Sequence, residues 1–337
     1  MKKLIQSMLM IWVATTQFTS CEKAILDEPV TNKKEVFNYL WKSVDEKYSF
    51  FELKNIDWNA IHSRFEPEIS NAMTNEQFFD TLAVMLDLLK DGHTGITSPF
   101  DDHKNPGFYT RGPENFNDRL IVDYYAHGWG HEKGALLHIP LADDQIGYVY
   151  YGDFSNNVTN DDIGYILNKY KNAKGLIIDI RNNTGGSADN IFKLAKRFTK
   201  SKTLVFKSIL KNGPEHSDFT EPTETWLEPA ESTYNGKVCV LTNRKVFSAA
   251  SVFTLAMREL PNVTIVGDTT GGGLGLPIGT ELPNGWQVHF SGSQLLSPDG
   301  ICYEMGIPPD VQVDMDKDDE DKGIDSIIET AIKIILE

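Results

Sequence analysis

The sequence is poor in cysteine and in basic residues, and each shortage excludes a class of protein. With only 3 cysteines in 337 residues, the chain cannot carry the disulfide framework of a small secreted domain. Its 32 lysines and arginines against 48 aspartates and glutamates give a formal net charge of −16. Because no basic stretch with interleaved aromatic residues interrupts this acidity, we do not expect nucleic acid as a partner.

The N-terminal apolar run is too short to span a bilayer. It covers residues 4–16 and follows two lysines, which is the layout of a secretory signal, so we predict a signal peptide at residues 1–20. A small residue directly before Cys21 resembles the bacterial lipoprotein cleavage box. We therefore expect an exported protein whose lipidated Cys21 anchors it in the cell envelope, in the outer membrane or the periplasm. An ordinary signal peptide with an incidental cysteine is the alternative.

Two further cysteines belong to the folded part of the chain. Cys239 and Cys302 each lie in an apolar run, so we expect buried thiols. A single disulfide between them is the alternative, because two cysteines alone do not define a disulfide framework.

The residues after the signal peptide form a tether, a helical part and a connector. Residues 21–34 carry charges and a proline without apolar periodicity, which is typical of a tether. In residues 35–95 apolar side chains recur every three or four positions and Thr74 begins a capping box, which predicts a small helical N-terminal domain. Residues 96–140 are rich in proline, aspartate and glycine around a strand-like run at 119–122, which indicates a connector of loops and short strands.

Short β runs alternate with helical patterns across residues 141–337. We predict strands at 146–150, 175–179, 237–241 and 263–266, helices at 159–172, 187–198, 248–260 and 324–336, and a polar hairpin at 280–290. This alternation favours an α/β core in which helices cover the sheet.

Ser248 stands between a predicted strand and a predicted helix, in the run Phe247-Ser248-Ala249-Ala250. At such a corner the serine side chain is accessible and the next amide N–H lies at the helix N-terminus. A serine nucleophile needs a base that takes its proton and donors that stabilise the oxyanion. The commoner role of a serine before a helix is to cap it, so position alone leaves both roles open.

A second corner of the same kind follows the predicted strand at 175–179. There, Thr184-Gly185-Gly186 precedes a helix, and glycine's backbone freedom can expose N–H groups to an anion. The alternative is a tight turn in which Asp179 and Arg181 only form local hydrogen bonds.

Among the 8 histidines, only His93 stands at the end of a predicted helix in a turn, Asp91-Gly92-His93-Thr94. A histidine in a loop between two domains can act as a general base. A surface turn residue is the alternative.

Together, five segments resemble the tail-specific, or C-terminal processing, peptidase family. They are the turn at 91–94, the turn at 179–186, the corner at 247–250, the loop Gly267-Asp268-Thr269-Thr270-Gly271-Gly272-Gly273 and the ending at 304–310. They occur in the family's order, over roughly residues 35–315. The resemblance implies a ClpP/crotonase-like α/β core with a small helical N-terminal domain. Many relatives carry a PDZ domain, and the interval 96–140 is too short for one, so we expect none.

The resemblance also implies which residue is the base. In the processing-protease branch a lysine of the glycine loop activates the serine, but Gly273 takes that position here. The chain is more similar to the tricorn-core and retinoid-binding-protein branch, in which His93 would be the base for Ser248 and Glu304 would support the polar network. Gly92 stands where tricorn has a serine beside the histidine.

For the oxyanion hole, the resemblance implies the amides of Ala249 and of Gly185 or Gly186. The predicted function is an exported serine peptidase that hydrolyses peptide bonds through an acyl-enzyme, with a peptide or protein substrate and without a metal or organic cofactor. Two alternatives remain. One is an inactive protein that binds a peptide or an apolar ligand on the same fold, and the other is a crotonase-like acyl-CoA enzyme, which the charge of −16 disfavours.

Overall fold

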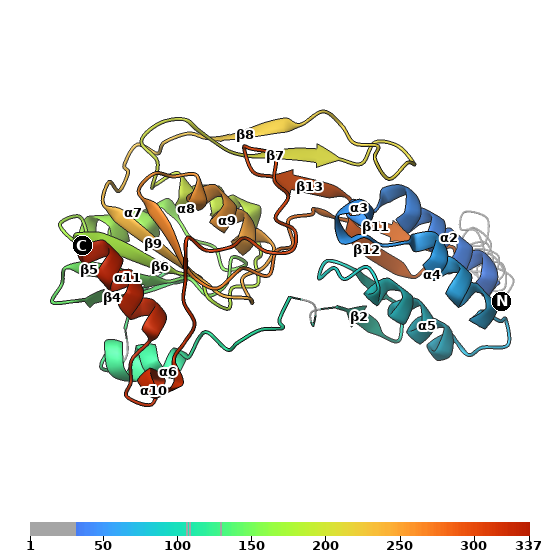
Figure 1. Cartoon of the computed structure of the whole chain (residues 1–337), viewed down its shortest axis with the longest axis horizontal. Coiled ribbons are helices and arrows are strands. Elements are labelled where there is room, and N and C mark those ends of the chain that lie inside the picture. The colour runs from blue at the N-terminus through green and yellow to red at the C-terminus, as the bar shows by residue number, and fades with distance from the viewer. Residues whose placement is uncertain (1–31, 106, 108, 129) are drawn as a thin grey trace, which may run out of the picture.

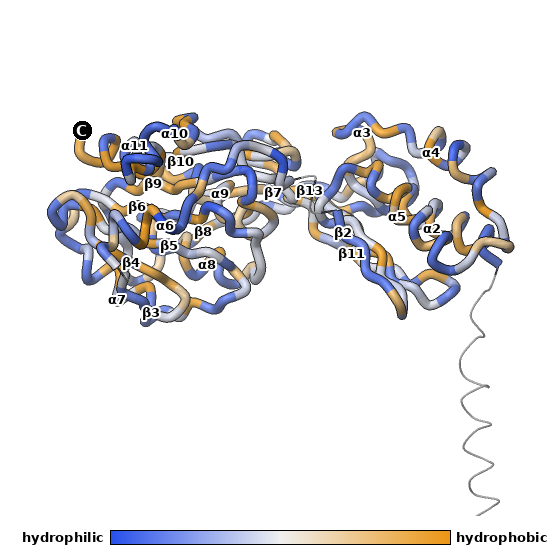
Figure 2. Tube along the Cα trace, turned by 90° about the horizontal axis from the view of Figure 1, so that it is seen from below, coloured by the Kyte–Doolittle hydropathy of each residue, from blue (hydrophilic) through white to orange (hydrophobic). Residues whose placement is uncertain are grey.

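The computed structural model describes residues 32–105, 107, 109–128 and 130–337, and the chain forms two lobes (Figure 1). The predicted signal peptide, Cys21 and most of the predicted tether lie outside these residues. Figure 2, turned by 90°, shows the two lobes side by side, each with hydrophobic segments running through it. The predicted catalytic residues come from both lobes, so each lobe is described in turn.

The smaller lobe is built from the N-terminal helices. These are α2 (Lys33–Lys47), α3 (Phe51–Lys54), α4 (Trp58–Phe65), the 3₁₀ turn η1 (Glu66–Glu68) and α5 (Asn75–Asp87). Their periodic apolar side chains, among them Phe37, Leu40 and Phe78, form one buried cluster. The capping box predicted at Thr74 is present at the start of α5 and fixes where that helix begins.

A β-hairpin from the C-terminal half of the chain completes the smaller lobe. The four-stranded sheet has the order β11-β12-β1-β2 and consists of β1 (Gly95–Thr97), β2 (Asp102–Lys104), β11 (Pro277–Glu281) and β12 (Gln287–Ser291). Ile96 lies opposite Val288, and Trp286 and Phe290 are buried against the N-terminal helices. Figure 1 shows β11 and β12 in the smaller lobe together with the N-terminal helices.

This hairpin departs from the division predicted from the sequence. The helical domain was expected at 35–95 and the core at 141–337, whereas segment 277–291 belongs to the smaller lobe and makes that lobe a mixture of helices and strands. The pairing partner of Val288 lies 192 residues away (288 − 96), which no local sequence pattern encodes.

The larger lobe surrounds a seven-stranded sheet of order β14-β10-β9-β6-β5-β4-β3. Its strands are β3 (His131–Lys133), β4 (Leu136–Leu141), β5 (Ile146–Tyr150), β6 (Gly175–Asp179), β9 (Lys237–Thr242), β10 (Val263–Gly267) and β14 (Val311–Gln312). From β5 to β14 the neighbouring strands are parallel, whereas β4 and β3 pair antiparallel. The predicted bounds of β5 and β6 are confirmed, and β9 and β10 each extend one residue further.

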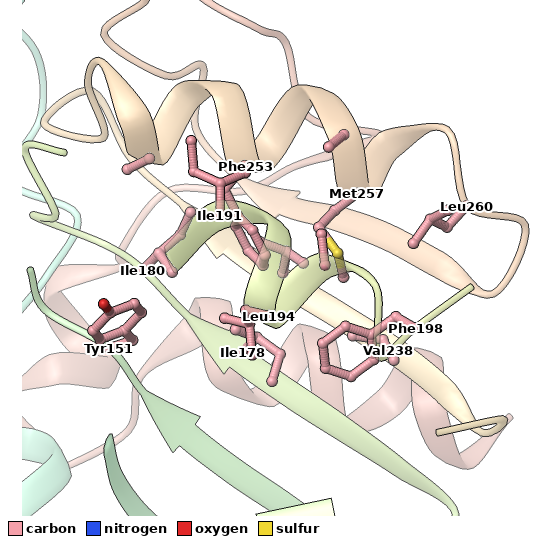
Figure 3. Packing of buried hydrophobic residues seen from close by; sticks show 14 of the residues in the cluster. Tyr151, Ile178, Ile180, Ile191, Leu194, Phe198, Val238, Phe253, Met257 and Leu260 are labelled. Atoms are coloured by element: carbon pink, nitrogen blue, oxygen red, sulfur yellow. The ribbon is translucent and has the colours of Figure 1, made fainter. Parts of the chain in front are cut away.

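Helices cover both faces of this sheet, which confirms the predicted α/β class. They are α7 (Asn160–Lys169), α8 (Ala188–Ala195), α9 (Ala249–Arg258), the short α10 (Lys317–Glu320) and α11 (Ser326–Leu336). On one face of the sheet, Ile178 packs with Leu194 of α8 and Phe253 of α9 (Figure 3). The preceding residue, Ile177, points to the opposite face and packs against α11. A bilayer-spanning segment is not found among the helices of the described residues.

A third sheet, of order β13-β7-β8, adjoins both lobes. It consists of β7 (Thr203–Leu210), β8 (Thr223–Leu227) and β13 (Ser293–Leu296), and Figure 1 shows β7 and β8 above the larger lobe. Only Gly292 separates β12 from β13, so the chain returns directly from the smaller lobe to the larger one.

One predicted strand of the connector is helical. Residues 119–122 fall in α6 (Asp118–Leu120) and in the π-helical η3 (Ile121–Tyr125), where Leu120 and Ile121 are both buried. The Asn117 side chain accepts a hydrogen bond from the Arg119 N–H at 3.1 Å and starts the helical turn. The prediction was wrong because a short apolar run fits a helix as well as a strand.

Both cysteines are free thiols, and the predicted burial is complete only for Cys239. Cys239 is buried beneath α11 and Cys302 is half-buried, and both are free. Burial raises the pKa of each thiol to about 12, which keeps both protonated and unreactive near neutral pH.

Candidate active site

Ser248 lies where β9 leads into α9. Its backbone has φ 54° and ψ −125°, which residues other than glycine rarely adopt, and its side chain makes no capping hydrogen bond to α9. Instead, Ser248 Oγ lies 2.9 Å from Nε2 of His93, 155 residues away in the sequence. The structure therefore places the hydroxyl against a potential base, and not in the N-cap role that was the alternative.

The glycine loop downstream holds the backbone of Ser248. The Ser248 N–H donates to the Gly272 carbonyl at 3.0 Å, and the Gly271 N–H donates to the Val246 carbonyl at 2.6 Å. Gly272 has φ 77°, and a Cβ there would lie 1.8 Å from the Glu304 carbonyl oxygen, so only glycine fits. The loop thus packs between Ser248 and the motif that contains Glu304.

His93 comes from the smaller lobe, in the turn after α5. Asp91 Oδ1 accepts a hydrogen bond from the His93 N–H at 2.8 Å and fixes this turn, while the Phe247 ring packs on the imidazole with 4.7 Å between the ring centroids. Burial lowers the pKa of His93 below its usual value, and the Asp91 charge opposes this effect only in part. The imidazole is therefore neutral at neutral pH, as a general base must be.

A side chain has no room at Gly92. A Cβ there would lie 2.4 Å from the Tyr109 ring and 2.7 Å from the Phe247 ring, and these two rings stack with centroids 3.8 Å apart. A serine at this position, as in the tricorn pattern, is excluded by this packing. Any group that orients His93 must come from another residue.

A buried lysine, Lys54 of α3, joins two carboxylates next to this turn. Its Nζ lies 3.5 Å from Asp91 Oδ2 and 3.2 Å from Glu304 Oε1, and the three side chains are 1%, 0% and 3% exposed, respectively. Lys54 also donates to the Tyr48 hydroxyl at 2.9 Å, and Glu304 Oε2 accepts from the Leu274 N–H at 2.7 Å. This cluster ties α3 of the smaller lobe to the ending motif of the larger lobe.

The pKa values of the two carboxylates are shifted in opposite directions. Burial raises the pKa of Glu304 to about 7, and Lys54 opposes that rise. Burial acts in the same direction on Asp91, but Lys54, His93 and the Asp91 hydrogen bonds outweigh it, so the pKa of Asp91 lies below its usual value. Asp91 is therefore the more firmly ionised of the two.

Sequence reasoning missed Lys54 and gave Asp91 no role. Lys54 ends a helix of four residues, and no motif or periodicity distinguishes it from the many surface lysines of the chain. Asp91 was visible as the first residue of the Asp-Gly-His-Thr turn. Only its burial and its contact with His93 indicate a function.

Two of the predicted oxyanion donors, Gly185 and Ala249, lie close to Ser248. A Cβ at Gly185 would lie 2.9 Å from the Ala249 nitrogen and 2.9 Å from Ser248 Cβ, so the two strand-to-helix corners touch here. The Gly185 N–H donates to Asn183 Oδ1 at 3.0 Å, whereas Ala249 begins α9, where the first amides have no helical acceptor. Gly186 packs its α-carbon against Ser155.

Asp179 and Arg181 form the structural core of their turn. Arg181 Nη2 lies 2.6 Å from Asp179 Oδ2 and Nη1 lies 2.9 Å from Asp325 Oδ2, with all three side chains fully buried. Burial alone would lower the pKa of Arg181, but the two carboxylates raise it well above its usual range. The local hydrogen-bonding role, which the sequence left as one of two alternatives, is therefore the one that the geometry supports for these two residues.

Two family profiles match this chain. That of peptidase family S41 matches residues 145–313, and that of the tricorn protease C1 domain matches residues 29–87. The first match covers half of the chain and includes Ser248 and Glu304. The chain belongs to peptidase family S41. The resemblance inferred from the motifs is thereby confirmed, and His93 lies between the two matched ranges.

Individual relatives agree with this assignment. A crystal structure from Parabacteroides merdae ATCC 43184, assigned as a candidate peptidase, is 40% identical and has a TM-score of 0.87, with 91% of this chain and 97% of that one covered. Mature CPAF shares the fold, with a TM-score of 0.67 at 13% identity and coverage of 90% and 96%. A Staphylococcus haemolyticus protein named "Probable CtpA-like serine protease" is 28% identical over 86% of this chain, which spans 60% of that protein's length.

Proposed function

We propose that this S41 family member is an exported serine endopeptidase in which Ser248 is the nucleophile and His93 the general base. The observation that carries the proposal is the 2.9 Å contact between Ser248 Oγ and His93 Nε2. The positive φ of Ser248 supports it, because strain of about 1–3 kcal/mol is retained in proteins mainly where function requires it. The proposal places the chain in the branch of the family that uses histidine in place of a loop lysine.

In the proposed reaction, Ser248 Oγ attacks the carbonyl carbon of the peptide bond while its proton passes to His93 Nε2. The tetrahedral intermediate collapses when His93 gives that proton to the leaving amine, and an ester remains on Ser248. A water molecule, deprotonated by His93, then attacks the ester carbonyl. The bond between this carbon and Ser248 Oγ breaks as His93 returns the proton to Oγ, and the acid product leaves. The lowered pKa of His93 supports this cycle because it keeps Nε2 free to accept the proton.

The negative charge of the intermediate needs donors beside Ser248. We assign this role to the amides of Ala249 and of Gly185 or Gly186, which lie at the two adjoining corners. Loss of one such donor slows turnover by about 10²–10³-fold in other serine hydrolases. Because the Gly185 N–H is already bonded to Asn183, Ala249 is the donor that the geometry favours most.

Glu304 is proposed to support the site from a distance. Its carboxylate contacts Lys54 and the Leu274 N–H, so it holds the glycine loop and the smaller lobe in register with each other. Its support of His93 thus passes through Lys54 and the relative position of the lobes.

The experiment is labelling with a serine-directed fluorophosphonate. Ser248→Ala is expected to abolish labelling, and His93→Ala to slow it by about 10²–10⁴-fold. Ser187→Ala is the matched control, because Ser187 holds the same position before α8 and also makes no capping hydrogen bond. Labelling should be unchanged in this control.

If the folded wild-type chain is not labelled and cleaves no member of a peptide library, the peptidase assignment is wrong. A protein that binds a peptide or an apolar ligand on this fold would then be the better description. Labelling that persists in Ser248→Ala would instead mean that another serine reacts.

We further propose that Cys21 is lipidated and holds the protein in the cell envelope. The support is the signal-type layout of residues 1–20 and the position of Cys21 directly after it. In a bacterial host fed a palmitate analogue, the wild-type chain should incorporate the label and Cys21→Ala should not. Equal incorporation by both would refute the anchor.

A further inference from the structure

Two polar atoms near His93 are buried without a hydrogen bond to any described residue. One is Nδ1 of His93 itself, and the other is Oδ2 of Asp91, two residues earlier in the same turn. Asp91 is already anchored here, since its Oδ1 accepts the His93 N–H at 2.8 Å and its side chain is fully buried. The acceptor Asp91 Oδ2 thus has an ion pair with Lys54 but no hydrogen bond, and the donor at His93 Nδ1 has no acceptor.

The proposed reaction requires a partner for Nδ1. A neutral imidazole that accepts a proton at Nε2 carries its own proton at Nδ1, and after the transfer that N–H bears part of a positive charge. The charged or titratable groups that act on His93 are Asp91 from its own turn, Lys54 from α3 and His289 from β12. Of these, only Asp91 is an anion.

Other candidates for this role are engaged or absent. Glu304 uses Oε1 for Lys54 and Oε2 for the Leu274 N–H. Position 92 has no space for a side chain between the Tyr109 and Phe247 rings.

We propose that Asp91 is the positioning residue of His93: when the imidazolium forms, Asp91 Oδ2 accepts a hydrogen bond from the Nδ1–H, and Lys54 holds Asp91 in place for this contact. The inference rests on the proposed function and adds to it, since that function assigns the supporting carboxylate to Glu304. Lys54 lies 3.5 Å from the same Oδ2 and keeps the buried carboxylate ionised, so it prepares the acceptor.

The test compares two isosteric variants that each remove one carboxylate next to Lys54, Asp91→Asn and Glu304→Gln. The rate of fluorophosphonate labelling of the full chain is measured against pH. Asp91→Asn should slow labelling by about 10- to 10⁴-fold. It should also move the acid limb of the profile to lower pH, because removal of the nearby negative charge lowers the pKa of His93. In Glu304→Gln the acid limb should stay where it is in the wild type.

A folded Asp91→Asn protein with the wild-type rate and the wild-type acid limb would overturn the inference, as would an equal shift in Glu304→Gln. If Asp91→Asn does not fold, ¹⁵N-histidine NMR of the Ser248→Ala protein at acid pH tests whether His93 Nδ1–H bonds to Asp91. A protected, strongly deshielded Nδ1–H of His93 supports the contact, and an Nδ1 proton in fast exchange with water refutes it. Because this readout needs no turnover, it stands apart from the proposed function, which is tested by labelling and peptide cleavage of the wild type.

Discussion

Two corners of the larger lobe are built almost alike and differ in what their serines contact. Each follows one of the adjoining parallel strands β6 and β9, and each places a serine, Ser187 or Ser248, directly before a helix without a capping hydrogen bond. Ser187 has φ −75° and ψ 126°, which any residue adopts. Ser248 has a positive φ and lies 2.9 Å from a histidine of the other lobe.

The corners are also joined to each other. The Asn182 N–H donates to Asn243 Oδ1 at 3.0 Å, the Asn243 side chain donates to Asn182 Oδ1 at 2.7 Å, and the Phe247 N–H donates to the Asn183 carbonyl at 3.1 Å. The first corner therefore acts as the rigid support on which the second is positioned. Two features distinguish Ser248, the candidate nucleophile, from Ser187: its strained backbone and its histidine partner from the other lobe.

The largest effect on stability is expected at the first corner, from Arg181→Met. The change leaves Asp179 and Asp325 fully buried without their counter-charge, which should lower the free energy of unfolding by about 3–5 kcal/mol. Urea unfolding followed by circular dichroism measures this loss. The exposed Arg119→Met is the control and should change stability by less than about 0.5 kcal/mol. An equal loss in both variants would mean that the buried cluster is not the support described here.

A smaller effect distinguishes the two serine backbones. In urea unfolding, the free energy of unfolding of Ser248→Gly should exceed that of Ser248→Ala by about 1 kcal/mol. Glycine relieves the strain of the positive φ, and the hydroxyl is lost in both variants. At the first corner the order should reverse, with Ser187→Gly less stable than Ser187→Ala by about 0.5–1 kcal/mol, because φ is ordinary there and glycine gains entropy in the unfolded chain. The same order at both corners would contradict strain at Ser248.

The sequence predicts those parts of this comparison that depend on local pattern. The bounds of β5 and β6 and the capping box of α5 follow from alternation and from residue pairs three positions apart. The hairpin at 277–291 was assigned to the wrong lobe because its partner strand is remote. The helical turn after Asn117 was taken for a strand because its apolar run, residues 120–122, is only three residues long.

The candidate site also contains residues that the sequence predicts and residues that it does not. Motif order was enough to pair Ser248 with His93 across 155 residues, and the structure brings their side chains together. Lys54 could not be predicted, because its function depends on burial between Asp91 and Glu304, and its contact with Glu304 exists only after the lobes have met. The role of Gly92 likewise follows from two aromatic rings that pack where its side chain would be.

The smallest effect is expected from Lys245→Ala. Lys245 is a basic side chain of the second corner, as Arg181 is of the first. Lys245 precedes Ser248 by three residues, but its Nζ bonds to Glu114 at 2.7 Å, and the two side chains are 33% and 63% exposed. An exposed pair of this kind contributes about 0.2–1 kcal/mol at most, so stability should change by no more than this, in contrast to Arg181→Met. Fluorophosphonate labelling should stay within about twofold of the wild type, since a lysine held by a surface carboxylate is not a base for Ser248. A loss of labelling comparable to that of His93→Ala would show that the lysine activates the serine after all, and the second corner would then supply its own base.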